Sequence, residues 1–128
     1  MKYIEDRSSV INPLADYEDL LKSKKKLRVK LGVDPTAPDV TLGWYAILRA
    51  LRKFQEYGHT AVLILGEFTA QVGDPSGKSA ERDFLSEDTL RENQVGIQAQ
   101  LEKFLEFHAG ANSAEVVNNY DWFKDFSF

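Results

Sequence analysis

The chain has 128 residues, of which 43% are hydrophobic and 28% are charged, a composition typical of one globular domain with its own core. The formal net charge of −4 gives no overall attraction to nucleic acid, and the absence of cysteine excludes a disulfide or a thiolate metal site. No apolar run approaches the ~20 residues of a membrane helix. The first residues are too polar for a signal peptide, so we expect a cytoplasmic protein with no membrane partner.

The first helix is predicted close to the N-terminus. Asn12-Pro13 combines a helix-capping side chain with a proline suited to the first helical position. Apolar residues then recur on one helical face, and lysines follow where the helix dipole favours cations. These apolar positions are Leu14, Tyr17, Leu20 and Leu21. We expect residues 1–26 to form an N-terminal helical segment.

The next segment has the order strand, turn, helix. Leu27 to Val33 predicts a buried strand that ends at Asp34-Pro35. Gly43 then opens an amphipathic helix, which ends at Gly58. The predicted buried face of this helix consists of Ile47, Leu48, Leu51 and Phe54. A strand followed by a short polar loop and a helix N-terminus is the layout of a nucleotide site in an α/β fold.

Two further strands and another helix continue this pattern. Ala61 to Leu65 is a nearly unbroken apolar run, which favours a parallel strand covered on both faces. Residues 67–83 contain glycine and proline and are predicted to be a loop. Ser86 caps a helix, weakened by Gly96, whose inner face is Leu90, Ile97, Leu101, Phe104 and Leu105. With a short strand at Ala114 to Asn118, the order predicts a parallel α/β sheet of about three strands with flanking helices.

The last eight residues, 121–128, contain four aromatic side chains. An apolar tail of this kind needs something to cover it. We therefore expect that the chain stops before the elements that would pack on this tail, and that self-association through the tail is possible.

Five motifs carry a resemblance to one enzyme family. They are Gly32-Val33-Asp34-Pro35-Thr36-Ala37, Thr41-Leu42-Gly43-Trp44, Gly58-His59, Gly73-Asp74-Pro75-Ser76-Gly77-Lys78 and Asn118-Asn119-Tyr120-Asp121-Trp122. In order and spacing they resemble bacterial tyrosyl-tRNA synthetases, which are class I aminoacyl-tRNA synthetases, from about Leu27 to the end. The resemblance covers the first half of that family's catalytic domain and implies that residues 27–128 are a partial Rossmann-like nucleotide-binding domain.

The resemblance implies a ligase that activates tyrosine with ATP to give tyrosyl-adenylate and then transfers tyrosine to tRNA. ATP is then a substrate that brings Mg²⁺ with it, and no tightly bound cofactor or protein metal site is expected. A tRNA partner is expected only for the full-length family, since its tRNA-binding region lies beyond the matched half.

The same resemblance implies roles for single residues. For ATP it implies binding by Gly32, Asp34, Thr36 and Gly43. It implies catalytic positions around the reacting phosphates at Thr41, Trp44, Lys78 and Arg82. For tyrosine it implies Asp34, Thr69, Asp74, Asn119 and Trp122, with Asp74 accepting a hydrogen bond from the substrate ammonium.

The chain departs from the family at its signature of two histidines, which are replaced here by Thr41 and Trp44. Threonine still donates one hydrogen bond, but the bulky indole cannot mimic histidine at a phosphate. Losing one transition-state donor typically costs about 10²–10³ in rate. We therefore expect the chain by itself to be weakly active or inactive.

Simpler interpretations stay open for several of these residues. Asp34 before Pro35 also suits a plain turn, Asp74 lies in ordinary turn sequence, and Trp44 suits a packing role. The alternative function is a non-catalytic module of the same fold that binds a nucleotide or a partner. A third hypothesis is RNA binding by the basic cluster of Lys22, Lys24, Lys25, Lys26, Arg28 and Lys30.

Overall fold

A computed structural model describes residues 2–6, 14–23, 25–72, 86–108 and 110–125. The elements in chain order are α1 (Lys2–Glu5), α2 (Leu14–Lys22), β1 (Arg28–Val33), α3 (Leu42–Glu56), β2 (Thr60–Leu65), α4 (Glu67–Val72), α5 (Glu87–Leu101), the 3-10 helix η1 (Gly110–Asn112), β3 (Glu115–Asn118) and α6 (Tyr120–Phe123). The predicted site residues Asp74, Lys78 and Arg82 lie outside the described residues, as does the Asn12-Pro13 helix start. No helix in these ranges is long and apolar enough to cross a membrane.

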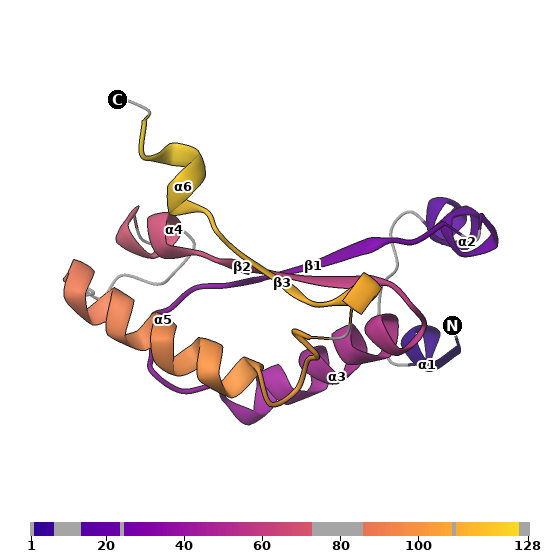
Figure 1. The fold of residues 1–128 in the computed structure, drawn as a ribbon, viewed down its shortest axis with the longest axis horizontal. Coiled ribbons are helices and arrows are strands. Elements are labelled where there is room, and N and C mark those ends of the chain that lie inside the picture. Colours follow the sequence, from indigo (N-terminus) through magenta and orange to yellow (C-terminus); the bar gives the residue numbers. More distant parts are fainter. Residues whose placement is uncertain (1, 7–13, 24, 73–85, 109, 126–128) are drawn as a thin grey trace.

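The three strands form one parallel sheet in the order β1-β2-β3. Arg28 pairs with Thr60 at one end of the first ladder, and Val33 pairs with Leu65 at the other. Helices α3 and α5 connect successive strands and lie on the same side of the sheet (Figure 1). The predicted α/β class and the three parallel strands are confirmed.

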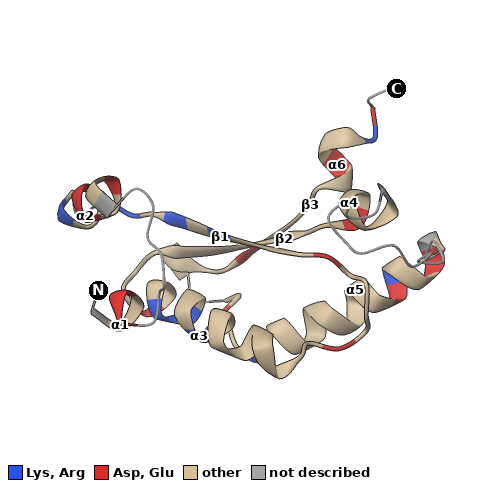
Figure 2. Ribbon diagram, turned by 180° about the vertical axis from the view of Figure 1, so that it is seen from behind, with Lys and Arg blue, Asp and Glu red and all other residues tan. Residues whose placement is uncertain are grey.

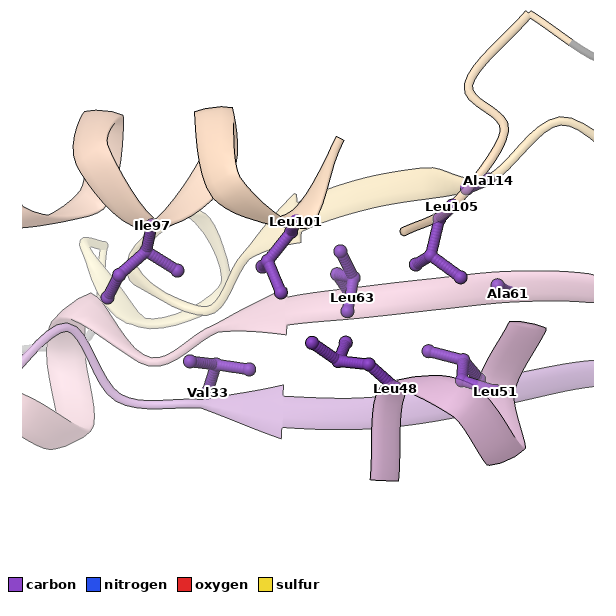
Figure 3. Close-up of a cluster of buried hydrophobic side chains, with 9 residues drawn as sticks. All are labelled: Val33, Leu48, Leu51, Ala61, Leu63, Ile97, Leu101, Leu105 and Ala114. Carbon is purple, nitrogen blue, oxygen red and sulfur yellow. The ribbon is translucent and has the colours of Figure 1, made fainter. Parts of the chain in front are cut away.

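The core lies between the sheet and these two helices. Figure 3 shows side chains of α3 and α5 pointing toward the strands, with Leu63 of the central strand in the middle. Nine buried residues form this cluster: Val33, Leu48, Leu51, Ala61, Leu63, Ile97, Leu101, Leu105 and Ala114. Burying a leucine side chain contributes about 1.5–3 kcal/mol, so this one layer is the main favourable term in the stability of the sheet.

The opposite face of the sheet is not covered by α3 or α5, which both lie on one side (Figure 1). The sequence favoured a strand β2 covered on both faces, and five of its six residues are buried. Val62, which alternates to the other face, is nevertheless only 6% exposed. Arg28 of β1 and Glu115 of β3 form an ion pair across β2, and the alternation of side chains places this pair on the face of Val62.

Helix α3 confirms the predicted helix but corrects its buried face and its first residue. The helix begins at Leu42, one residue before Gly43, and it ends as predicted before Gly58, whose φ is 88°. Leu48 and Leu51 are buried as predicted, whereas Ile47 is 47% exposed. Gln55 is the third buried residue of α3 instead, because the face of α3 that meets the sheet runs through positions 44, 48, 51 and 55.

The predicted loop 67–83 is wrong at its start, because Glu67–Val72 forms the helix α4. Its first turn is stabilised from outside: Asn119, directly after β3, accepts a hydrogen bond from the Phe68 amide at 2.9 Å. Buried Glu67 accepts a second one from Asn118 at 2.6 Å. A cap supplied by residues about 50 positions away leaves no signal in the local sequence.

Gln55 fastens the segment between α5 and β3 to helix α3. Its side-chain amide donates to the carbonyls of Glu106 at 2.7 Å and Asn112 at 3.0 Å, and its side-chain oxygen accepts from the Glu106 amide at 2.9 Å. Asn112 in turn donates to the Gln55 carbonyl at 2.8 Å. Because Gln55 is only 3% exposed, water cannot replace these partners without rearrangement.

We expect Gln55→Leu to lower the free energy of unfolding by about 2–4 kcal/mol, because it removes three hydrogen bonds, and only the Glu106 carbonyl keeps another donor, the Ala114 amide. Gln98→Ala is the matched control, since the Gln98 side chain donates to the exposed carboxylate of Glu102, the residue directly after α5. Urea denaturation of both variants measures the difference. Equal midpoints for Gln55→Leu and the unaltered chain would contradict the assigned role.

Candidate functional site

The carboxyl ends of the three strands meet at one edge of the sheet. Asp34, Gly66 and Asn119 each follow the last residue of a strand. The Gly66 amide donates to the Val33 carbonyl at 2.8 Å, and the Asn119 amide donates to the Leu65 carbonyl at 2.9 Å, so the ladder continues one residue beyond the strands. Ligands of open parallel sheets bind at this edge, which makes it the candidate site.

A hydrogen bond across the edge joins Asp34 to Thr69 in the first turns of α4. The Thr69 hydroxyl lies 2.8 Å from Oδ1 of Asp34 and 3.0 Å from the Gly66 carbonyl oxygen, so its single proton serves these two acceptors. The Asp34 carboxylate rests directly over Gly66: a Cβ at this position would lie 1.8 Å from Oδ1 of Asp34. Only glycine leaves room for this contact.

Asn119 completes the group from the third strand. Its side-chain amide donates to the Thr69 hydroxyl at 3.2 Å, while its oxygen accepts from the Phe68 amide. Asn119 is 5% exposed, whereas Asp34 and Thr69 are exposed. The structure therefore brings three predicted tyrosine-site residues together, with Asn119 as the buried support of an accessible carboxylate and hydroxyl.

A pocket of about 370 Å³ lies beside this group. The loop after β1 and the start of α3 form one wall, and Ile97 and Leu101 of α5 form part of the other. The lining contains the predicted ATP-site residues Gly32, Asp34 and Thr36 and both replaced histidine positions, Thr41 and Trp44. A Cβ at Gly32 would meet nothing within 4 Å, so a ligand has free access to the backbone there.

The start of α3 borders this pocket. Thr41 has extended backbone angles and makes no side-chain cap hydrogen bond, although its carbonyl accepts from the Trp44 amide at 3.0 Å. The first amides of a helix have no acceptor within it and carry partial positive charge. Trp44 is half-buried and packs against the core, as its predicted packing role requires.

The charged side chains in the described lining of the pocket are all acidic. Among the described residues that line it, Asp34 and Asp39 are acidic and none is Lys or Arg. Figure 2 shows the acidic colour in the segment that follows β1 and the basic colour on β1 itself and near α2. Such a pocket favours an ammonium group over a bare phosphate. No group of three potential metal-ligating side chains occurs within the described ranges.

The remaining predicted residues differ in their surroundings. Thr36 is exposed, and its amide donates to the Asp34 carbonyl at 2.8 Å in a tight turn around Pro35. Gly43 lies in the first turn of α3, but it is absent from the pocket lining. Trp122 is 50% exposed on α6, and its amide donates to the Asn119 carbonyl at 3.1 Å.

Sequence reasoning missed Gly66, Asn93 and Gln100. Gly66 is an isolated glycine between an apolar strand and a helix, which is a usable signal for close backbone approach. Asn93 and Gln100 bond the loop after β1 from α5. Their spacing of seven puts both on one helical face, but nothing in the sequence says what that face meets.

Comparisons with known proteins agree on one family. The sequence model of class I tRNA synthetases (W and Y) matches residues 22–128. A tyrosine–tRNA ligase of Cytophaga hutchinsonii is 52% identical over 111 residues, which are 87% of this chain and 26% of that protein. A tyrosine–tRNA ligase of Bacteroides fragilis is 45% identical over 132 aligned positions, covering 100% of this chain and 30% of that protein.

A solved structure has the same fold. The crystal structure of a C-terminally truncated mitochondrial tyrosyl-tRNA synthetase from Coccidioides posadasii matches with a TM-score of 0.71 and 28% identity. The match covers 99% of this chain and 37% of that one. The chain thus spans less than a third of the length of the two bacterial relatives.

We expect Gly66→Ala to destabilise the chain by about 1–3 kcal/mol, because the new methyl group expels the Asp34 carboxylate and strains the backbone. Gly32→Ala is the matched control, since its Cβ points into open space. Urea denaturation measures both. A loss in Gly32→Ala as large as that in Gly66→Ala would show that the contact with Asp34 is not the cause.

Proposed function

Because the chain belongs to the class I tRNA synthetase family for tryptophan and tyrosine, we propose that it is the portion of a tyrosine–tRNA ligase that binds tyrosine and ATP. The observation that carries this proposal is the connected group of Asp34, Thr69 and Asn119 at the edge of the sheet, beside a pocket. Tyrosine would enter with its ammonium toward Asp34. ATP would occupy the pocket along Gly32 and Thr36.

Adenylate formation needs little covalent chemistry from the protein. The tyrosine carboxylate attacks the α-phosphorus of ATP, the bond to the β-phosphate oxygen breaks, and pyrophosphate leaves. The protein must hold both substrates in line and stabilise the charge on the phosphate. We assign the first task to Asp34 with the loop 35–40, and the second to the amide end of α3, which reaches the pocket at Thr41 and Trp44 and contains Gly43.

The phosphate end of this proposed site is weak. Thr41 and Trp44 offer one hydroxyl and one indole donor where the family has histidines, and the described lining adds no cation. Mg²⁺ carried on the ATP phosphates would offset the acidic lining, since this ion binds through a few carboxylates and phosphate oxygens. Lys78, Arg82 and Asp74 keep their predicted roles as part of the proposal. A cytoplasmic location and tRNA as partner of a longer protein also belong to it.

The alternative is a module that binds a nucleotide or a partner without catalysis. Its specific support is Trp44, which packs on the core and lines the pocket where the family places a catalytic side chain. On α6, Trp122 is 50% exposed and Phe123 is 36% exposed. Phe123 stacks on Phe68 with ring centroids 4.8 Å apart, so self-association would proceed mainly through Trp122.

We expect the purified chain to bind ATP but to show no tyrosine-dependent exchange of pyrophosphate into ATP. Losing two phosphate donors reduces the rate by roughly 10⁴ or more if each contributes the usual 10²–10³. Calorimetry with ATP·Mg²⁺ measures binding, and radiolabelled pyrophosphate measures exchange. Clear exchange would refute the inactivity, and absent ATP binding would refute the nucleotide site.

We expect Asp34→Asn to weaken tyrosine binding about tenfold, since it removes the charge from a hydrogen bond to ammonium while keeping the acceptor for Thr69. Binding is followed by ligand-observed NMR with tyrosine and with 3-(4-hydroxyphenyl)propionate, which lacks the ammonium. The second compound is the control and should bind both forms equally. An equal loss for both compounds would mean that Asp34 does not recognise the ammonium.

A further inference from the structure

One face of α5 is bonded to the loop that follows β1. Asn93, Gly96 and Gln100 lie at a spacing of three and four residues, so they share one side of the helix. The side chains of Asn93 and Gln100 and the backbone of Gly96 all meet residues 35–40. These contacts join segments about 60 positions apart, and they are separate from the group formed by Asp34, Thr69 and Asn119.

Gln100 uses both ends of its side-chain amide on this loop. Its oxygen accepts from the Val40 amide at 3.0 Å. Its nitrogen lies 3.0 Å from the Pro38 carbonyl oxygen and 3.2 Å from Oδ1 of Asp39. A side chain that donates and accepts at once fixes both the position and the rotation of the backbone between Pro38 and Val40.

Asn93 and Gly96 hold the rest of the loop. The Asn93 amide donates to the Pro35 carbonyl at 3.0 Å, and Asn93 is only 7% exposed. A Cβ at Gly96 would lie 3.1 Å from the Pro38 carbonyl oxygen, tighter than an ordinary contact. The glycine that weakens α5 as a helix thus lets the loop backbone approach it.

We propose that Asn93, Gly96 and Gln100 hold residues 35–40 in the conformation that binds ATP, which makes Gln100 a positioning residue for the nucleotide. This inference rests on the proposed function. The loop leads directly into Thr41 and the amide end of α3, and Ala37, Asp39 and Val40 line the pocket with Ile97 and Leu101 of α5. Residues 36–39 are exposed and form no helix or strand, so regular secondary structure does not fix their backbone conformation. The hydrogen bonds from Gln100 to Pro38 and Asp39 restrict that conformation instead.

The expected loss of ATP affinity follows from the fraction of molecules in which the loop has its binding conformation. When the binding-competent conformation is only a fraction of the total, the apparent affinity falls by that fraction. Without Gln100, the carbonyl of exposed Pro38 can bond water instead, while the amide of half-buried Val40 loses its acceptor. The loop then samples several conformations while the core of Leu48, Leu63 and Leu101 stays packed.

Gln100→Ala tests the proposal, with Gln98→Ala as the matched control on the same helix, where the Gln98 side chain donates to Glu102 and not to the loop. For Gln100→Ala we expect faster hydrogen exchange of the Val40 amide and about tenfold weaker binding of ATP·Mg²⁺ by calorimetry. For Gln98→Ala we expect neither change. Exchange at amides of β2 serves as the internal reference, because a purely structural role of Gln100 would raise exchange there as well.

Gly96→Ala is the second variant and covers the case in which Gln100→Ala fails to fold. Alanine is the better helix former, so α5 should gain stability while the new methyl group displaces Pro38 by a few tenths of an ångström. We expect weaker ATP binding together with an unchanged or higher unfolding midpoint. A merely structural role predicts that binding and stability change in the same direction.

The outcomes separate this inference from the proposed function. If the unaltered chain does not bind ATP, the proposed nucleotide site fails and this inference fails with it. If the unaltered chain binds ATP and both variants bind it equally well, only the positioning role is overturned. Faster hydrogen exchange of the Val40 amide with unchanged ATP affinity also overturns the positioning role, because motion of the loop would then have no effect on ATP binding.

Discussion

The hydrogen bond from Thr69 to Asp34, made over the bare backbone of Gly66, is the contact on which the arrangement of the site depends. It exists only because the strands are parallel, so that residues following β1 and β2 reach the same edge. The bond also joins the start of α4 to the end of β1. Asn119 extends it to the third strand, and the sheet edge becomes one connected polar group.

The same edge is shaped from the helical side by α5. Residues 32–44 supply most of the pocket lining, and residues 35–40 among them are hydrogen-bonded to residues about 60 positions later in the chain. Two independent sets of contacts therefore converge on the loop after β1, one through Asp34 at its start and one through Pro38 to Val40 near its end. If the proposed adenylate-forming reaction depends on holding two substrates in line, fixing both ends of such a loop would serve it directly.

Hydrophobic periodicity was sufficient to predict the parallel sheet and helices α3 and α5, because their buried positions repeat over several turns. It placed Ile47 on the wrong face, since one residue on a helix is a rotation of about 100° and the pattern does not fix the phase so closely. Helix α4 was missed because its cap comes from Asn119. The site roles of Asp34, Thr69 and Asn119 were predicted from the family resemblance, whereas Gly66 and Gln100 became visible only through the atoms that they approach.

The two ends of the pocket differ in how completely they are built. Asp34, Thr69 and Asn119 satisfy one another's hydrogen bonds and leave an accessible carboxylate for an ammonium. At the other end Thr41 makes no side-chain cap, and Trp44 is engaged in packing against the core. In the proposed function, binding an amino acid would use the first end, and stabilising a pentavalent phosphate would use the second. The geometry therefore favours the recognition part of that proposal over its phosphoryl chemistry, because Trp44 is engaged in packing at a position assigned to the phosphates.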